Sequence, residues 1–132
     1  MAKKKETLHQ KLNYIQSNLK VEKGRTNSFG KYKYRNLEGI LEGLKPLLKK
    51  HNASVVISDE IVCINEMNYV KATVVLNYDN GSISSQAFAR EAVTKKGMDD
   101  SQITWTASSY ARKYACNGLF AIDVTVDADG MD

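Results

Sequence analysis

Residues 23–35, KGRTNSFGKYKYR, combine five cationic side chains with three aromatic ones and contain no carboxylate. The cations can contact a polyanionic backbone, and the aromatic rings offer faces on which unpaired bases stack for roughly 1–3 kcal/mol per base. The segment therefore suits single-stranded nucleic acid, and it suits equally a cationic loop whose tyrosines pack into the core. Its candidate contact residues are Arg25, Lys31, Tyr32, Lys33, Tyr34 and Arg35.

The charge of the chain is unevenly distributed along its length. Residues 1–50 hold 13 Lys/Arg and 4 Asp/Glu, a net charge of +9, whereas residues 51–132 hold 6 and 11, a net charge of −5. A basic first third favours an anionic partner such as nucleic acid. It could equally pair head to tail with the acidic end of a second copy.

The overall composition is that of one globular domain. With 132 residues, 42% hydrophobic and 26% charged, the chain can bury a single core, which we place in residues 1–122, followed by a short acidic segment at 123–132. No apolar run approaches the roughly 20 residues of a membrane helix, and no apolar segment follows the basic N-terminus as in a signal peptide. Cys63 and Cys116 lack metal spacing and predict free thiols in a reducing cytoplasm.

Two amphipathic helices are predicted in the first third of the chain. Apolar residues recur at helical spacing from Glu6 to Val21, and Thr7 or Glu6 suits the N-terminus of that helix. A wider apolar stripe follows over residues 37–52, with Asn36 as N-cap. Pro46 is expected to kink or divide this second helix. The cations that complement the dipole at its end are Lys49, Lys50 and His51.

A β-meander is predicted next. Residues 54–64 are rich in Val and Ile, and Asp59–Glu60 indicates a bend or bulge. Two further strands, 69–79 and 82–90, are joined by Asn80–Gly81, a strong hairpin signal. Alternation along the first of these two strands assigns a core side made of Val70, Ala72, Val74 and Leu76.

The turn at Asn80–Gly81 predicts a register in which Lys71 faces Arg90. Two cations directly opposite on a sheet repel unless an anion lies between them. Glu60 or Glu91 could be that anion, and so could a bound phosphate. Lys71 and Arg90 are therefore candidate contact residues.

A third helix is predicted from about residue 100 to Asn117, with Gly118 as its stop. A polar loop carrying Lys95 and Lys96, two further candidate contacts, precedes it. The solvent side of this third helix is expected to carry Trp105, Ser109, Arg112 and Lys113. An exposed Trp beside Arg is common at recognition surfaces. Its buried face is predicted to be Ile103, Ala107, Tyr110, Ala111, Tyr114 and Ala115.

An enzyme has little support in this sequence. There is no Gly-rich phosphate loop and no nucleophile elbow, and we expect no cofactor. His9 and His51 are far apart and are expected on the surface. Asp123, Asp127 and Asp129 keep a metal-dependent nuclease as an alternative. A protein-interaction adaptor with a basic docking loop is the other alternative.

Two blocks of the sequence stand out. The first is FGKYKYRNLEGILEGLKPLLKKH, residues 29–51, and the second is MDDSQITWTASSYARKYACNGLFAID, residues 98–123. Together they resemble the essential recombination function (ERF) family of phage single-strand annealing proteins. Their order and spacing, with the hairpin between them, match the N-terminal domain of the family over nearly the whole chain.

The resemblance implies an α+β fold, with a three-stranded antiparallel meander packed on a long helix and two helices before it. This β-β-β-α core is similar to that of the eukaryotic strand-annealing recombinases. The resemblance also implies a homo-oligomeric ring or filament that binds single-stranded DNA and anneals complementary strands without ATP. It implies a phage- or prophage-encoded protein in the cytoplasm of a bacterial host, with single-strand-binding protein as a further partner.

Two motifs of the family match this sequence position by position. Tyr32, Tyr34 and Arg35 match its aromatic-basic motif, and residues 110–114 match its central helix motif, in which Arg112 and Lys113 are the best candidates for contacts with the DNA backbone. Tyr110 and Tyr114 are expected in the core.

Two features depart from the family pattern. Trp105 stands where a small residue such as Gly is expected, which could alter the groove or a subunit contact. The sequence also ends where family members continue into a linker and tail, so we expect either a short form or part of a longer protein.

Overall fold

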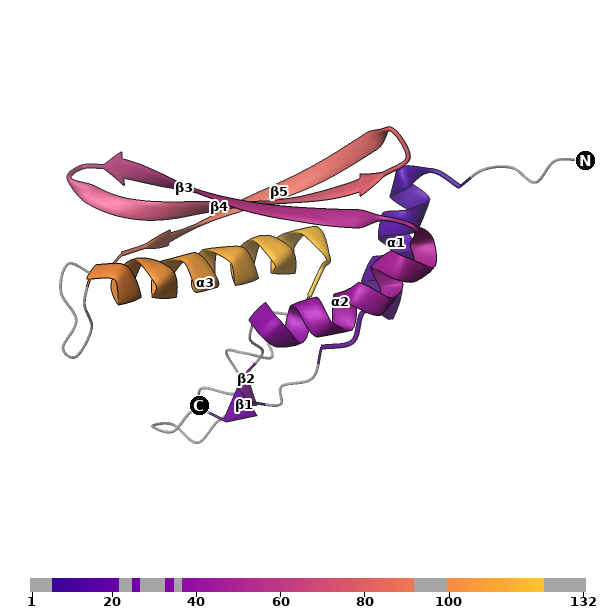
Figure 1. Cartoon of the computed structure of the whole chain (residues 1–132), viewed down its shortest axis with the longest axis horizontal. Coiled ribbons are helices and arrows are strands. Elements are labelled where there is room, and N and C mark those ends of the chain that lie inside the picture. Colours follow the sequence, from indigo (N-terminus) through magenta and orange to yellow (C-terminus); the bar gives the residue numbers. More distant parts are fainter. Residues whose placement is uncertain (1–5, 22–24, 27–32, 35–36, 92–99, 123–132) are drawn as a thin grey trace, which may run out of the picture.

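The computed structural model describes residues 6–21, 25–26, 33–34, 37–91 and 100–122, with the backbone alone for 25–26, 33–34 and 100–102. It confirms the α+β class: a three-stranded antiparallel sheet lies along a long final helix, and two helices precede the sheet (Figure 1). A two-stranded pairing, β1 with β2, was not predicted. The elements are α1 (Leu8–Asn18), β1 (Arg25–Thr26), β2 (Lys33–Tyr34), α2 (Leu37–His51), β3 (Ser54–Ile64), β4 (Met67–Tyr78), β5 (Gly81–Arg90) and α3 (Asp100–Leu119).

The predicted register of the β4–β5 hairpin is wrong by two residues. Tyr78 pairs with Gly81, so the two turn residues are Asp79 and Asn80, and Asp79 adopts a left-handed conformation with φ 58°. Asp tolerates that conformation, which explains how Asp79–Asn80 can form the turn in place of Asn80–Gly81. A shift of two residues preserves the alternation, and the predicted core side of β4 is therefore confirmed.

Strand β3 runs without interruption, so the predicted bend or bulge is wrong. Asp59 pairs with Ala72 and Glu60 with Lys71 inside a continuous ladder. Because successive side chains point to opposite faces, Asp59 faces α3 and Glu60 faces away from it. Asp59 and Glu60 therefore fit into a continuous strand, because their side chains lie on different faces of the sheet.

Helix α3 packs closely on the sheet because its contact stripe is made of small residues. Ala107, Ala111 and Ala115 are buried against β4 and β5. Gly118 lies inside the helix and is not its stop: a Cβ at this position would come 3.0 Å from Ser85 Oγ, so glycine here permits close packing on β5. The left-handed residue after the helix is Ala121, with φ 55°.

Helices α1 and α2 pack at the end of the sheet where the β4–β5 hairpin turns (Figure 1). Helix α1 begins with a capping box, in which Thr7 Oγ1 accepts from the Gln10 N–H at 3.2 Å and Gln10 Oε1 accepts from the Thr7 N–H at 2.7 Å. Pro46 does not divide α2, which is one helix of 15 residues. The aliphatic residues that α1 and α2 bury are Leu12, Ile15, Ile40 and Leu44.

Candidate nucleic-acid interface

The part of α3 that the sheet leaves uncovered carries exposed aromatic side chains and a lysine. Trp105 is 70% exposed, Tyr110 49% and Tyr114 46%. The rings of Tyr110 and Tyr114, one turn apart, stack with centroids 6.1 Å apart and an interplanar angle of 28°. Lys113 Nζ lies 6.0 Å from the Tyr110 ring centroid. Trp105 and the tyrosine pair lie on opposite flanks of the exposed part of the helix, with Lys113 between them. We call these four residues the α3 face.

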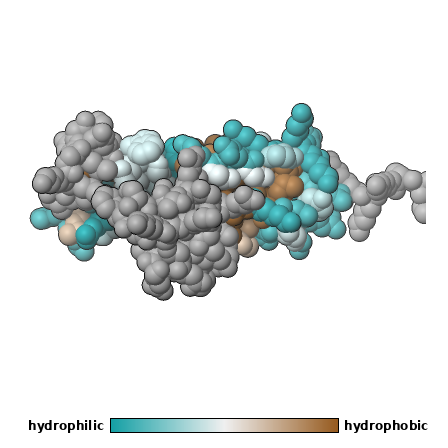
Figure 2. All heavy atoms as spheres, turned by 90° about the horizontal axis from the view of Figure 1, so that it is seen from below, coloured by the Kyte–Doolittle hydropathy of each residue, from teal (hydrophilic) through white to brown (hydrophobic). Residues whose placement is uncertain are grey.

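The expectation that Tyr110 and Tyr114 belong to the core is wrong. The sheet covers only a narrow stripe of α3, which the alanines fill, and the two tyrosines lie at the border of that stripe. The predicted exposure of Trp105 is confirmed. Figure 2 views the molecule from the helix side, where most of the coloured surface is hydrophilic and the apolar atoms gather toward the α1–α2 end.

Arg112 is held by an ion pair across to β3. Its Nε lies 3.0 Å from Asp59 Oδ1, and its Nη2 lies 3.0 Å from Asp59 Oδ2. Ser108, one turn earlier on α3, donates from Oγ to Asp59 Oδ2 at 2.6 Å. Burial alone would raise the pKa of Asp59, but these hydrogen bonds outweigh it and hold that pKa below its usual value. The residue proposed to contact DNA backbone is thus paired with a carboxylate of its own chain.

Lys71 and Arg90 do not face each other. The predicted repulsion between them therefore does not arise, and no bound anion is required to offset it. Lys71 pairs with Phe88 on one side and with Glu60 on the other, and its Nζ lies 6.0 Å from the Phe88 ring centroid. Arg90 pairs with Tyr69 instead, and its Nη1 lies 3.3 Å from Met67 Sδ. Both cations lie on the face of the sheet opposite α3.

That outer face also carries exposed apolar side chains, among polar and charged ones such as Glu60, Lys71 and Arg90. Its exposed large apolar side chains come from all three strands, and among the described elements none covers it (Figure 1). Exposed apolar side chains that no described element covers are available for contact with another macromolecule. The residues are Val56, Ile64, Met67 and Phe88.

The remaining candidate residues are only partly described. Arg25 pairs with Tyr34 across β1 and β2, next to the pair of Thr26 and Lys33, so the backbone brings both ends of the basic–aromatic segment together. The other candidates lie outside the described residues, as does the acidic segment 123–132 with Asp123, Asp127 and Asp129. These are Lys31, Tyr32, Arg35, Lys95 and Lys96.

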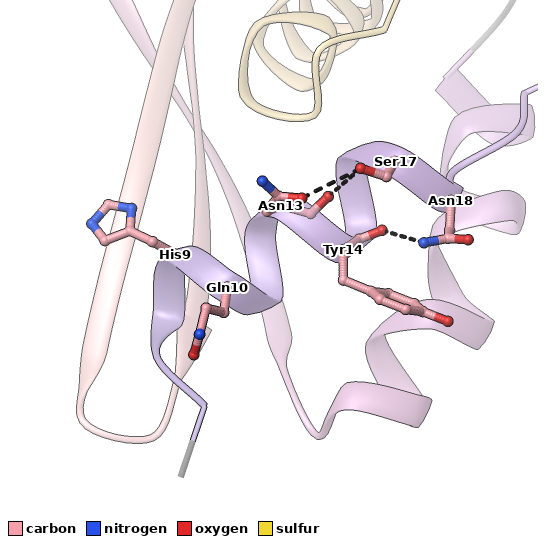
Figure 3. A pocket seen from close by; sticks show the side chains of 6 residues that line it. All are labelled: His9, Gln10, Asn13, Tyr14, Ser17 and Asn18. Carbon is pink, nitrogen blue, oxygen red and sulfur yellow. Dashed lines mark hydrogen bonds between the residues drawn. The ribbon is translucent and has the colours of Figure 1, made fainter. Parts of the chain in front are cut away.

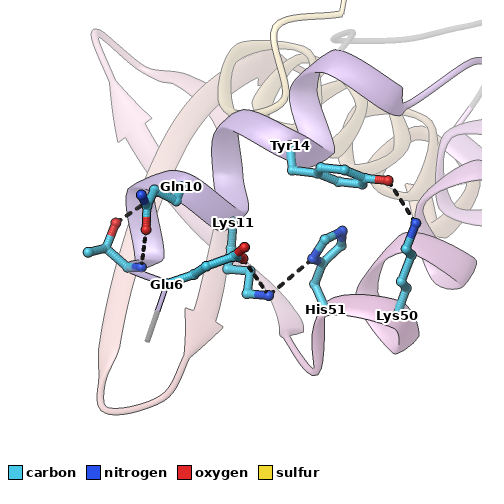
Figure 4. Close-up of polar contacts among 7 residues, drawn as sticks. Glu6, Gln10, Lys11, Tyr14, Lys50 and His51 are labelled. Carbon is cyan, nitrogen blue, oxygen red and sulfur yellow. Dashed lines mark hydrogen bonds and ion pairs between the residues drawn. The ribbon is translucent and has the colours of Figure 1, made fainter. Parts of the chain in front are cut away.

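A polar network between α1 and α2 was missed by the sequence analysis. His51 is buried, contrary to the expectation of a surface position, and its ring lies 4.2 Å from that of Tyr14 (Figure 4). Lys11 Nζ lies 3.3 Å from His51 Nδ1 and 2.8 Å from Glu6 Oε2. Lys50 donates to the Tyr14 hydroxyl at 2.7 Å. The only sequence signal was the helical spacing that places Lys11 and Tyr14 on one side of α1.

This environment lowers the pKa of His51 from its ordinary value. Burial is the largest cause, because it disfavours the charged ring, and the positive charges of Lys11 and Lys50 act in the same direction. His51 Nε2 finds no hydrogen-bond partner among the described residues. The neutral imidazole is therefore the form that fits between the two helices.

A shallow hollow of about 440 Å³ lies along the exposed side of α1 (Figure 3). It is lined by uncharged amide and hydroxyl side chains and by one exposed histidine. Two of these side chains donate hydrogen bonds to backbone carbonyls of α1: Ser17 Oγ to that of Asn13, and Asn18 Nδ2 to that of Tyr14. Nothing in this set resembles an acid–base pair. The lining residues are His9, Gln10, Asn13, Tyr14, Ser17 and Asn18.

The described part of the chain contains potential metal ligands and two cysteine thiols. Within it, no three His, Cys, Asp or Glu side chains come together as a metal site. Cys63 and Cys116 are free thiols, and burial raises the pKa of Cys116 to about 11, which disfavours its thiolate. No helix of the described residues is long and apolar enough to cross a membrane.

Comparison with known proteins identifies the family. The model of the ERF superfamily matches residues 8–132. The chain is 56% identical over 115 residues to the Essential recombination function protein of Salmonella phage P22. That match covers 87% of this chain and 55% of the relative, so the chain spans about half the length of the curated relative it matches. No solved structure gave a significant match. This chain belongs to the ERF superfamily.

Proposed function

We propose that this protein binds single-stranded DNA and anneals complementary strands without ATP, as an oligomeric ring or filament, in homologous recombination of phage DNA. Membership of the ERF superfamily and the high identity to a phage recombination function protein support the recombination role. The absence of a Gly-rich phosphate loop from the sequence is in keeping with a reaction that needs no nucleotide. The same relative supports a place of action in the cytoplasm of a bacterial host.

The observation that carries the DNA-binding part is the α3 face. An annealing protein must neutralise phosphates while it leaves base edges free to pair. Exposed rings can hold bases by stacking without reading their edges, and Lys113 adds a positive charge beside them. This combination supports binding that is sequence-blind and sensitive to salt.

The oligomeric part follows from the size of the domain. One α3 face offers few contacts, so a single copy would bind weakly, whereas linked copies gain avidity steeply. Strands β3 and β5 are both edges of the described sheet, and its outer face carries exposed apolar side chains. Both features support contact between copies. We also propose that β3, β4, β5 and α3 correspond to the core of the eukaryotic strand-annealing recombinases, which an experimental structure of the oligomer would test.

The decisive experiment measures annealing of complementary oligonucleotides without nucleotide, together with the molecular mass of the protein. We expect acceleration of annealing, a large oligomer, and binding that weakens steeply as salt rises. Trp105→Ala should cost roughly 1–3 kcal/mol of binding for each base that it stacks. Lys113→Ala should weaken binding more than Lys45→Ala, which removes the same charge from α2. A protein that stays monomeric with and without oligonucleotide, and does not speed annealing, contradicts the proposal.

A protein-interaction adaptor is the second candidate, and the exposed apolar side chains on the outer face of the sheet are the observation that favours it. An adaptor would bind single-stranded DNA weakly, and its binding would be indifferent to Lys33→Ala and Arg112→Ala. The annealing protein should lose affinity with both variants, and the same oligonucleotide titrations separate the two functions.

A further inference from the structure

Three hydrogen-bond donors of α3 converge on one carboxylate of β3. Arg112 contributes Nε and Nη2, and Ser108 contributes Oγ, all within 3.0 Å of an oxygen of Asp59. Ser108 and Arg112 are one helical turn apart, so α3 alone sets the spacing of the donors. The acceptor comes from a different element, 49 residues earlier than Ser108. The donor set and its occupant can therefore separate without unfolding α3.

The same donors suit a phosphate. A guanidinium fork binds two oxygens of a carboxylate or of a phosphate with similar geometry, and a serine hydroxyl can donate to either anion. The Arg112 side chain is 34% exposed and that of Asp59 is 25% exposed. Asp59 lies on β3, an edge strand of the sheet. A polynucleotide backbone passing along this edge could reach the donors from solvent.

We propose that Arg112 and Ser108 form a phosphodiester site for single-stranded DNA, and that Asp59 occupies this site in the free protein and is displaced by a backbone phosphate. This inference rests on the proposed function. Asp59 then acts as an internal competitor that weakens binding at the edge of the α3 face and keeps the guanidinium oriented until a strand arrives. Binding of one phosphate exchanges one anion for another, so Arg112 never remains unpaired.

The exchange predicts that removal of the competitor strengthens binding. Asp59→Asn keeps the shape of the side chain but not its charge, and should tighten single-stranded DNA about fivefold, the equivalent of a partly exposed ion pair of about 1 kcal/mol. Glu66→Gln is the matched control, because it removes one carboxylate from the β3–β4 turn, away from Arg112. It should give only the small gain that follows from a change in net charge.

A double-mutant cycle tests whether the gain in affinity for single-stranded DNA depends on Arg112. Arg112→Ala in the Asp59→Asn background should abolish the increase in affinity, since the donors that Asp59 releases are then gone. Fluorescence anisotropy with a labelled oligonucleotide measures all four proteins, and thermal unfolding confirms that each is folded. The inference is overturned when Asp59→Asn binds no tighter than Glu66→Gln, or when its gain persists without Arg112.

A measurement on the unmodified protein covers the case in which Asp59→Asn does not fold. The carbon-13 shift of the Asp59 carboxyl group and the nitrogen-15 shift of Arg112 Nε should both change when oligonucleotide is added. Binding without these changes overturns the displacement of Asp59 while the proposed function stands. A wild-type protein that binds no single-stranded DNA overturns both.

Discussion

Two contacts between distant parts of the chain are built from opposite electrostatics. Where α3 meets β3, a carboxylate accepts from Arg112 and Ser108, so positive charge meets negative charge. Where α1 meets α2, Lys11, His51 and Lys50 lie together around Tyr14, and the carboxylate of Glu6 bonds to Lys11 at the edge of this group. The contact between α3 and β3 pairs opposite charges, whereas the contact between α1 and α2 depends on a neutral His51.

The two regions also differ in how they fill their cores. Helix α3 approaches the sheet through alanines, while α1 and α2 bury large aliphatic side chains such as Ile15 and Leu44. Close approach through small residues is sensitive to added volume, and packing through large residues is sensitive to lost volume. The comparison therefore predicts opposite responses to mutation in the two regions.

The largest effect is expected in the α1–α2 region. Leu44→Ala removes a fully buried side chain and should lower the free energy of unfolding by about 2–5 kcal/mol, through lost burial and a cavity. Urea denaturation measures the change. Leu37→Ala, at a partly buried position of the same helix, should cost less. Equal losses for the two variants would show that α2 is not anchored as described.

The α3 region should respond to added volume instead. Ala111→Leu inserts three carbons between α3 and the sheet and should cost about 1–3 kcal/mol of unfolding free energy. Ser109→Leu makes the helix more apolar on its outward side and serves as the control, with little expected change. A neutral Ala111→Leu would mean that α3 can move away from the sheet, and the contrast with α2 would fail.

The next effect is pH dependence in the α1–α2 region. The folded-state pKa of His51 lies below the unfolded value near 6.5, so the stability linked to its neutral ring is complete above that pH and is lost as pH falls through the lower folded pKa. The melting temperature should therefore fall below about pH 6.5. His51→Gln should remove this component, and His9→Gln should keep it. An unchanged pH profile for His51→Gln would refute the role given to the neutral ring.

The Asp59 contact should hold through that same pH range. Its folded-state pKa lies below the ordinary value of 3.8, so its contribution is present above pH 3.8 and is lost only as pH falls further. Hydrogen exchange at pH 5.5 should therefore show α1 opening while α3 stays protected. Opening of both helices together would show that the two regions unfold as one cooperative unit.

The smallest effect is expected for Tyr14→Phe. The variant loses the 2.7 Å hydrogen bond from Lys50 but keeps the ring beside His51. Because that bond is exposed, the expected loss is about 0.5 kcal/mol, measured by thermal unfolding. A loss above about 2 kcal/mol would mean that the hydroxyl matters more to the α1–α2 contact than the ring.

Most of the fold was predictable because its signals are local. Helical spacing located α1 and α2, and alternation located the core side of β4, since burial of one face is imposed by the period of each element. The hairpin register was not predictable, because Asp79–Asn80 and Asn80–Gly81 are both acceptable turns. Packing of the folded hairpin decides between the two turns.

The candidate site was predictable only in part. The exposure of Trp105 followed from its position opposite the alanine stripe of α3. The stacking of Tyr110 on Tyr114 was obscured by their helical spacing, which fits a buried stripe as well as its border. The pairing of Arg112 with Asp59 joins residues 53 positions apart, and no spacing rule connects them.

The amino-acid order alone determined the class of fold, the uneven charge and the membership of a family, since periodicity, composition and motifs are properties of neighbours along the chain. Only the tertiary structure decided which partner each polar group meets. It placed His51 between two lysines and Arg112 against Asp59, because burial and charge pairing depend on which surfaces meet in space.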